Sequence, residues 1–235
     1  MENIPDKSID MILADLPYGI TANTWDTIIP FDKLWSQYNR IIKDNGCIAL
    51  FGQEPFSSEL RMSNLKMYRY DWIWVKSRAG GFLNAHKMPL RTHENVSIFY
   101  KHLPTYNPQM RTGFKAYAQK PTKKYSSNYQ ISAKLAKKYK GSKSSGERYP
   151  IDVINFKSIS CKGMHPTQKP TDLLEYLIKT YTNPGDIVLD NVMGSGSTGV
   201  AAVKNNRNFI GMEQDAQYFK TAQQRINEVK GDNHV

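Results

Sequence analysis

The chain has only 2 cysteines among its 235 residues, Cys47 and Cys161, which is too few for a disulfide framework or a paired-cysteine zinc motif. We therefore predict two reduced thiols, no metal site and a cytosolic setting. Residues 1–10 lack a basic region followed by an apolar stretch, which excludes a signal peptide. No apolar run reaches the roughly 18 residues of a membrane helix. We expect a cytoplasmic protein with no membrane contact.

Acidic residues are scarce in one long part of the chain. Between Lys101 and Lys169 there are fifteen Lys or Arg residues and two acidic residues, a local net charge of 15 − 2 = +13. The whole chain has a net charge of +11, so the remainder is close to neutral. Eight aromatic residues are spaced between positions 106 and 156. Because cations can pair with phosphates and aromatic rings can stack on bases, this segment indicates a nucleic-acid partner. The alternative interpretation is a solvated basic loop that has no partner.

Short apolar runs alternate with helical patterns along the rest of the chain. The runs predict strands over 9–14, 47–51, 70–75, 96–100, 187–190 and 209–212. Apolar residues at helical spacing predict helices over 31–42, 55–65, 173–181, 200–203 and 216–229. Gly46 is expected to end the first helix, and segment 76–95 is expected to be a loop. The alternation predicts an α/β fold with a Rossmann-like, mostly parallel sheet and helices on both faces.

A glycine-rich loop follows the strand at 187–190. Gly194, Gly196 and Gly199 stand between this strand and the next helix, and Glu213 ends the following strand. The arrangement is typical of a site for a ligand that carries an adenosine, with the acid accepting hydrogen bonds from the ribose. By itself it does not separate a nicotinamide dinucleotide from S-adenosylmethionine. No Lys-Ser or Lys-Thr follows the last glycine, which excludes a P-loop.

A second loop, Asp15-Leu16-Pro17-Tyr18, follows the first predicted strand. The amino group of a base is a poor nucleophile because its lone pair is delocalised into the ring. A carboxylate such as Asp15 and a carbonyl such as that of Leu16 can accept its two N–H bonds and free the lone pair. Pro17 fixes the chain direction, and Tyr18 can stack on a base that has left the helix. Taken alone, this tetrapeptide is more often a turn than a catalytic site.

Both loops directly follow predicted strands of the same sheet. Ligands of such sheets bind at the carboxyl ends of the strands. We therefore expect the two loops to open on the same edge of the sheet.

The motifs together resemble the beta class of amino-group DNA methyltransferases. Asp15–Tyr18 resembles the catalytic motif of this family, and Asp190–Gly199 resembles its cofactor motif. His165–Pro170 is similar to the motif that precedes the cofactor motif, and Thr92–Asn95 is similar to part of a late strand of the catalytic half. The order of catalytic half, recognition insert and cofactor half is the circularly permuted order of that class.

The resemblance implies an S-adenosylmethionine-dependent methyltransferase that acts on duplex DNA, with adenine N6 favoured because Asp heads the catalytic motif. It divides the chain into a catalytic half (1–100), a basic target-recognition insert that binds DNA (101–164) and a cofactor-binding half (165–235). A homodimer stays open. The implied catalytic residues are Asp15, Leu16, Pro17 and Tyr18. The implied cofactor-binding residues are Thr167, Lys169, Asp190, Gly194, Ser195, Gly196 and Glu213, with Lys169 near the carboxylate of the cofactor.

Three features depart from the pattern of the family. Asn191-Val192 replaces the usual Pro-Phe, which removes a ring that would pack against the cofactor. Leu16 replaces a commoner proline, but only its carbonyl is needed. The family usually has one further strand before the catalytic half, and its absence would expose a sheet edge beside the adenine of the cofactor.

Three other functions stay open on this evidence. A methyltransferase acting on cytosine N4 or on an RNA base would share the fold and the chemistry. A dinucleotide-dependent oxidoreductase explains the glycine loop but neither Asp15–Tyr18 nor His165–Pro170. A non-enzymatic DNA-binding relative is favoured by the short N-terminus and by Asn191-Val192, and it is opposed by the intact Asp15 and Tyr18.

Overall fold

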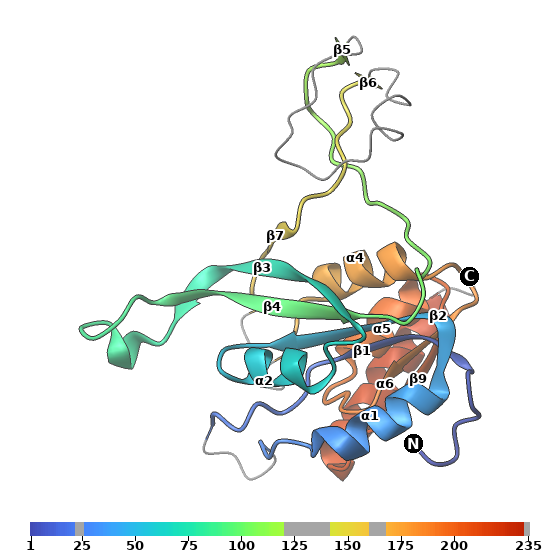
Figure 1. Cartoon of the computed structure of the whole chain (residues 1–235). Helices are drawn as coiled ribbons and strands as arrows, with labels where there is room; N and C mark the ends of the chain where they lie inside the picture. The colour runs from blue at the N-terminus through green and yellow to red at the C-terminus, as the bar shows by residue number, and fades with distance from the viewer. Residues whose placement is uncertain (22–25, 120–141, 160–167, 233–235) are drawn as a thin grey trace. The chain divides into compact units, whose positions relative to one another are not determined.

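The computed structural model describes residues 1–21, 26–119, 142–159 and 168–232 (Figure 1). The chain divides into two compact units, of which the larger consists of Met1–Asn107 and Asp152–Val235. The smaller unit is Pro108–Ile151. The predicted insert 101–164 and the smaller unit therefore have different boundaries.

A seven-stranded sheet with the order β7-β3-β4-β2-β1-β8-β9 forms the centre of the larger unit. Four of its neighbouring pairs are parallel, and the pairs β2–β4 and β3–β4 are antiparallel. This confirms the predicted mostly parallel α/β sheet. The strands are β1 (Ile9–Ala14), β2 (Ile42–Gly52), β3 (Tyr68–Gly80), β4 (Arg91–Phe99), β7 (Val153–Phe156), β8 (Ile187–Asp190) and β9 (Asn208–Gly211).

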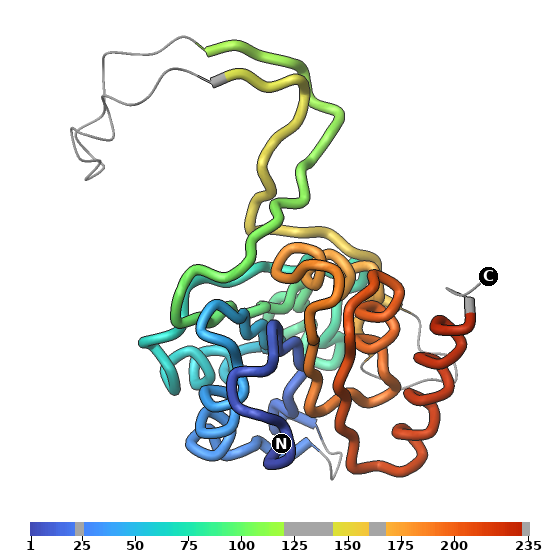
Figure 2. The backbone as a smooth tube through the Cα atoms, turned by 90° about the vertical axis from the view of Figure 1, so that its right-hand side faces the viewer, coloured from blue at the N-terminus to red at the C-terminus, as the bar shows by residue number. Residues whose placement is uncertain are grey.

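Helices cover both faces of the sheet, as predicted (Figure 2). One face packs against α1 (Phe31–Ile41) and α2 (Phe56–Ser63), and the other packs against α4 (Thr171–Tyr181) and α5 (Ser197–Lys204). The last helix, α6 (Ala216–Asp232), lies against α5. No helix in the described part of the chain is long and apolar enough to cross a membrane.

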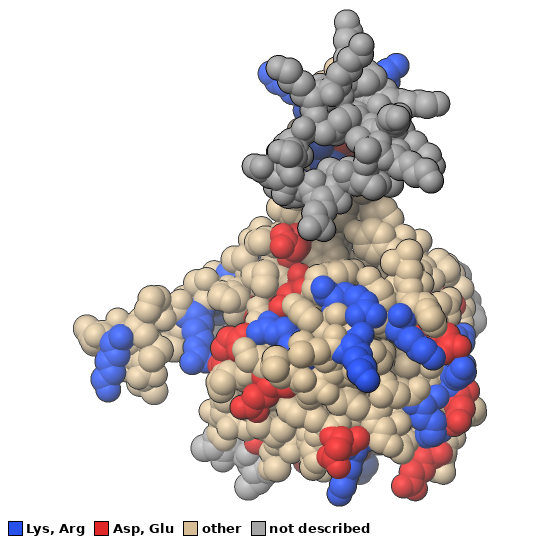
Figure 3. Space-filling model, in the orientation of Figure 1, with Lys and Arg blue, Asp and Glu red and all other residues tan. Residues whose placement is uncertain are grey.

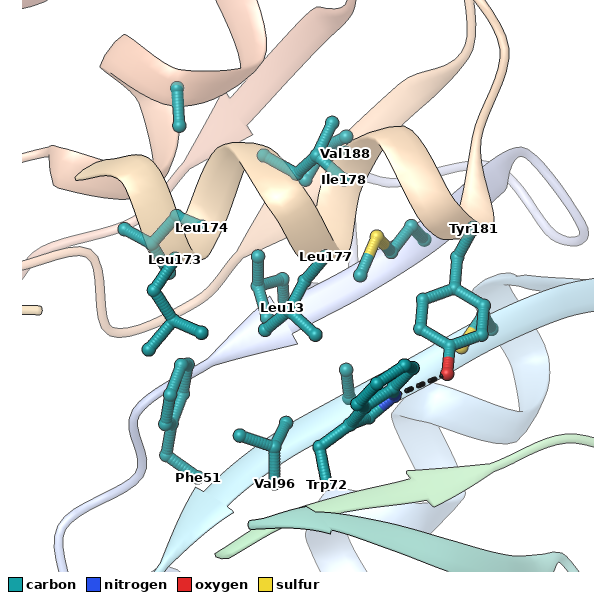
Figure 4. Close-up of a cluster of buried hydrophobic side chains, with 14 of the residues drawn as sticks. Leu13, Phe51, Trp72, Val96, Leu173, Leu174, Leu177, Ile178, Tyr181 and Val188 are labelled. Carbon is teal, nitrogen blue, oxygen red and sulfur yellow. Dashed lines mark hydrogen bonds between the residues drawn. The ribbon is translucent and has the colours of Figure 1, made fainter. Parts of the chain in front are cut away.

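The core on the α4 face explains why the apolar runs of the sequence form central strands. Figure 4 shows Leu173 and Leu177 of α4 directed toward the sheet, where Leu13 of β1 lies. Trp72 of β3 donates a hydrogen bond of 2.6 Å from its indole nitrogen to the hydroxyl of Tyr181. Both rings are buried, so this bond satisfies polar atoms that would otherwise destabilise the core.

Gly46 does not end the first helix, and this prediction is wrong. The helix α1 ends at Ile41, and Ile42 is already extended and begins β2. The register between β1 and β2 shifts here, because Ile9 lies opposite Ile42 whereas Met11 lies opposite Cys47. A Cβ atom at Gly46 would approach the carbonyl oxygen of Asp10 to 3.0 Å. The glycine therefore permits a close approach of two strands.

The prediction of a loop over 76–95 is also wrong at both ends of the segment. β3 continues to Gly80, β4 begins at Arg91, and the two strands pair as far as their ends. Cross-strand hydrogen bonds thus order a segment whose Gly, Arg and His content favours a loop. The resulting hairpin extends beyond the sheet, with the short helix η1 (Phe82–Asn84) at its tip (Figure 1). We call residues 76–93 the β3–β4 arm.

The smaller unit contains a two-stranded ladder of β5 (Tyr117–Gln119) and β6 (Ser142–Ser144), which are antiparallel. The guanidinium groups of Arg111 and Arg148 lie 5.2 and 5.4 Å from the ring centre of Phe114. These two cations of the predicted insert thus stack on one of its own aromatic rings. Residues 120–141, which hold seven of its Lys residues, lie outside the described residues.

Candidate active site

A cavity of about 1260 Å³ opens where β1 and β8 end. These strands are parallel neighbours, with Ile12 opposite Leu189, so the loops that follow them meet at one edge of the sheet. Asp15–Tyr18 and Asp190–Ser195 both line the cavity, which confirms the expectation that the two loops share an edge. The volume exceeds the roughly 300–1000 Å³ of a typical small-molecule site, so the cavity has room for two ligands side by side.

Both carboxylate oxygens of Asp15 have partners in the cavity wall. Oδ1 accepts a hydrogen bond from the hydroxyl of Tyr18, and Oδ2 lies 2.5 Å from Nζ of Lys169. Burial, the negative charge of Asp15 and that of Glu94 raise the pKa of Tyr18 well above its ordinary value, which keeps the phenol protonated as a donor. The ring of Tyr18 stacks on Phe56 of α2 with their centres 5.0 Å apart. These contacts fix the direction of the Asp15 carboxylate.

Lys169 connects Asp15 to a second buried carboxylate, Glu94 of β4. Its Nζ lies 3.3 Å from Oε2 of Glu94, and the side chains of Lys169 and Glu94 are 9% and 6% exposed. Glu94 Oε1 pairs with Lys76 of β3 and accepts a hydrogen bond of 2.9 Å from Gln53. Burial alone would lower the pKa of Lys169, but the charges of Asp15 and Glu94 outweigh it and raise that pKa. The cavity wall therefore holds an ionised chain of alternating charge.

Glu94 and Lys76 were not predicted to be site residues. Glu94 stands within Thr92–Asn95, a motif that was recognised only as part of a strand. Its signal was a carboxylate in a buried strand, which requires a partner. Lys76 lies in the segment predicted to be a loop, so no pairing with β4 was expected.

Asp26 holds the chain that follows the Asp15–Tyr18 loop. Its carboxylate accepts hydrogen bonds from the backbone nitrogens of Gly19, Ile20 and Thr21, at 2.9, 3.0 and 2.7 Å. Burial alone would raise the pKa of Asp26, but hydrogen bonds from Thr21, Gly19 and Ile20 outweigh it and lower the pKa. Three donors directed at one carboxylate fix the path of this loop, and Asp26 also lines the cavity.

The glycine loop is joined to the acid that ends the next strand. The backbone nitrogen of Gly194 donates a hydrogen bond of 2.8 Å to Oε2 of Glu213, and both residues line the cavity. Gly196 is not among the cavity-lining residues. Its φ angle is 81°, and a Cβ atom there would lie 2.7 Å from Cβ of Ala222 in α6. This glycine therefore serves the close packing of α5 against α6.

Asp190 and Asn191 are anchored beneath the loop. Burial, opposed by a hydrogen bond from Thr198, raises the pKa of Asp190 to about 7. The hydroxyl of Tyr38, which is buried in α1, lies 2.5 Å from Oδ1 of Asn191. Asn191, which stands where the resembled motif has a proline, is thus hydrogen-bonded to helix α1. Val192 lines the cavity in place of the ring that the resembled motif would carry there.

Of the remaining predicted site residues, one lies in the cavity wall and one lies outside the described residues. Ser195 lines the cavity, and its hydroxyl lies 3.0 Å from a nitrogen of Arg225 and 3.4 Å from Oε1 of Gln168. Thr167 and His165 lie outside the described residues.

The arrangement carries donors and acceptors that suit two adjoining ligands. Carboxylates from Asp190 and Glu213 stand on the β8–β9 side of the cavity, where a diol or an ammonium group would find acceptors. Asp15, Tyr18 and Trp74 stand on the side nearer β3, where a flat ring with an amino group would find a carboxylate and aromatic faces. The site thus places an acceptor for N–H bonds beside a second ligand position.

Comparison with known proteins identifies the family. The sequence matches the DNA methylase family over residues 9–224. The chain belongs to the DNA methylase family. Type II methyltransferase M2.MboI of Moraxella bovis is 28% identical to it, over 97% of this chain and 84% of that protein. DNA adenine methyltransferase YhdJ of Escherichia coli (strain K12) is 27% identical, over 96% of this chain and 79% of that protein.

A solved structure of the M1.HpyAVI–SAM complex has a similar fold. The TM-score is 0.61 at 26% sequence identity, and the match covers 95% of this chain and 90% of that one. The fold class and the family predicted for this DNA methylase are therefore confirmed. The dinucleotide-dependent oxidoreductase, which the glycine loop alone left open, is excluded by a family match that spans both halves of the site.

Proposed function

We propose that this DNA methylase transfers a methyl group from S-adenosylmethionine to N6 of adenine at a specific site in duplex DNA. The observation that carries the proposal is the meeting of two loops in one cavity, Asp15–Tyr18 after β1 and Asp190–Ser195 after β8. Adenine is supported by the aspartate at the head of the catalytic motif. It is also supported by the similarity to a protein named as a DNA adenine methyltransferase.

Asp15 is the acceptor that activates the amino group of the base. Its carboxylate oxygens each retain a lone pair beside their bonds to Tyr18 and Lys169, so an N–H group of the base can also donate to them. The carbonyl of Leu16 accepts the second N–H bond, and Pro17 sets its direction. The nitrogen becomes more tetrahedral, and its lone pair is directed at the methyl group. The proton that is released after transfer passes to solvent through the open cavity.

The cofactor is held on the β8–β9 side of the cavity, and the residues present fit it. Bound there, it supplies a methyl group that is already activated as part of a sulfonium ion. Glu213 keeps one lone pair on each oxygen beside its bonds to the backbone nitrogens of Gly194 and Asp215, which suits the two ribose hydroxyls. Asp190 lines the same side and would pair with the cationic amino group of the cofactor. Lys169, paired with Asp15 and Glu94, lies between the two ligand positions.

DNA is bound in part by the basic insert 101–164. Its net charge of 14 − 2 = +12 supports contacts to phosphates, and its aromatic residues support contacts to bases. A homodimer and action in the cytoplasm remain predictions from the sequence.

The identity of the product tests the proposal. We expect labelled N6-methyladenine after incubation of the protein with tritiated S-adenosylmethionine and mixed-sequence duplex DNA, followed by digestion to nucleosides. Label in N4-methylcytosine would keep the mechanism and correct the base. The absence of label from both duplex DNA and RNA, with cofactor binding intact, would favour a non-enzymatic DNA-binding relative.

Cofactor affinity is expected to rise with pH through about 7, because Asp190 must ionise to pair with the cationic end of the cofactor. Below that pH the carboxyl is protonated, and binding must release its proton, which weakens affinity by up to about tenfold per pH unit. Calorimetry in two buffers that differ in ionisation enthalpy measures both the affinity and the released proton.

An Asp190→Asn variant supplies the control for this prediction. It should bind the cofactor more weakly above pH of about 7 and release no proton below it. A parent protein whose cofactor affinity is the same on both sides of this pH would contradict the assignment of Asp190.

A further inference from the structure

The β3–β4 arm begins at the active site and ends in exposed apolar side chains. Lys76 at its root lines the cavity, as does Trp74, which precedes the arm in β3. At its tip, Leu83 is 100% exposed, Phe82 is 67% exposed and Met88 is 49% exposed. A cluster of exposed apolar side chains on a projecting hairpin marks an interaction surface.

The arm is also purely cationic outside its root. Between residues 77 and 93 there are three Lys or Arg residues, Arg78, Lys87 and Arg91, and no acidic residue. All three are exposed, and within the described part of the chain no carboxylate forms an ion pair with them. Figure 3 shows blue side chains on the projecting arm at the left, with uncharged surface between them. The larger unit is otherwise of mixed charge, so the arm is set apart from it.

We propose that the β3–β4 arm is a second DNA-contacting element, which holds the duplex beside the flipped base. Its three cations bind phosphates, and Phe82 and Leu83 pack against or between base pairs. The inference rests on the proposed function, because it takes duplex DNA as the substrate. It assigns to the arm a role that the sequence gave only to the insert 101–164.

The length of the arm matches this role. Gly80 is four residues beyond Lys76, which is about 13 Å along a strand. The arm therefore extends at least about 13 Å beyond Lys76, a length comparable to about four base-pair steps of a duplex. Apolar side chains such as Phe and Leu are used by DNA-binding proteins as wedges that unstack a base step. A wedge there kinks the duplex and holds it on the arm, which positions the target base at the cavity.

The apolar tip would also suit a second copy of this chain. The charge of the arm favours DNA over a second copy of the chain. In a symmetric contact between two arms the three cations of each arm would repel those of the other, whereas phosphates would neutralise them. Dimerisation through the arm is therefore an outcome that the experiment must be able to detect.

The cationic part of the proposal is tested by DNA binding, which needs no knowledge of the target site. The variant Arg78→Gln/Lys87→Gln/Arg91→Gln is compared with Lys33→Gln/Lys66→Gln/Lys220→Gln, which removes three exposed charges elsewhere on the larger unit. Fluorescence anisotropy with a mixed-sequence duplex should show the arm variant at least about tenfold weaker, with a salt slope lower by about 2 to 3. Equal losses in both variants would overturn the proposal.

The tip is tested by photocrosslinking. Leu83 is replaced by p-benzoylphenylalanine, and the matched control carries the same group at Met62, which is 68% exposed on α2. Crosslinks to DNA are expected from position 83 and not from position 62. Crosslinks from position 83 to a second copy of the chain, or to nothing, would overturn the proposal.

A loss-of-function variant completes the test. Phe82→Ser/Leu83→Ser should methylate DNA about tenfold more slowly at the parent cofactor affinity, whereas Met62→Ser/Leu65→Ser should match the parent. These outcomes are independent of which base is methylated. If the product were N4-methylcytosine, the adenine assignment would fail and the arm assignment would stand.

Discussion

An Asp15→Asn variant is expected to methylate DNA about 10³-fold more slowly than the parent while its affinity for S-adenosylmethionine stays nearly unchanged. The amide retains the size of the side chain but presents one acceptor oxygen without a charge, so it no longer polarises the amino group of the base. Asp15 follows β1, whereas Asp190 ends β8 and Glu213 follows β9, which is why cofactor binding should survive. Single-turnover methylation and calorimetry with the cofactor measure the two effects separately.

The matched control is Asp44→Asn, the same change at an aspartate whose side chain is 50% exposed and pairs with Lys7. This variant should retain the activity of the parent. An Asp15→Asn protein that methylates DNA at the parent rate would show that another group activates the base.

A Lys169→Met variant is expected to be less stable by about 3 kcal/mol, because it leaves the buried Glu94 without one of its two cations. The side chain of Lys169 is 9% exposed, so solvent cannot replace the lost charge. Asp15, with its side chain 26% exposed, loses its partner at lower cost. Urea unfolding followed by circular dichroism measures the free energy of unfolding.

The double variant Lys169→Met/Glu94→Gln separates this explanation from a general packing defect. A neutral amide at position 94 still bonds to Gln53 and needs no second cation, so the double variant should be more stable than Lys169→Met alone. If the effects of the two substitutions on the free energy of unfolding were additive, the buried charge pair would not be the cause of the lost stability.

Methylation should fall in both Lys169 variants. Lys169 fixes one oxygen of the catalytic carboxylate at 2.5 Å, and a methionine cannot. The restored stability of the double variant therefore would not restore the rate, which would distinguish a positioning role from a purely structural one.

Most of the sheet could be predicted from the sequence, because its central strands are continuous apolar runs. Ile9–Ala14 has both neighbours parallel and both faces covered by helices, so every position except that of Asp10 is apolar and buried. The helices α1 and α4 could be predicted equally well, because Leu34 and Tyr38 in α1 and Leu173 and Leu177 in α4 repeat at helical spacing.

The arm and the helix end at Ile41 could not be predicted in this way. The outer part of the arm is held by hydrogen bonds between β3 and β4 rather than by burial, so its sequence shows no apolar pattern. At Ile41 the chain enters β2 because a neighbouring strand is available, and not because a glycine follows.

The candidate site likewise has parts that follow from local sequence and parts that depend on tertiary contacts. The sequence by itself determined the two loops and the edge where they meet, because each is a local motif placed at the end of a strand and parallel strands align their ends. Only the tertiary structure decided that Lys169 lies between Asp15 and Glu94, residues that are 154 and 75 positions away in the chain. Ion pairs of this kind leave no periodic trace in a sequence. They form because burial removes water from charged groups, and each must then find its opposite charge in space.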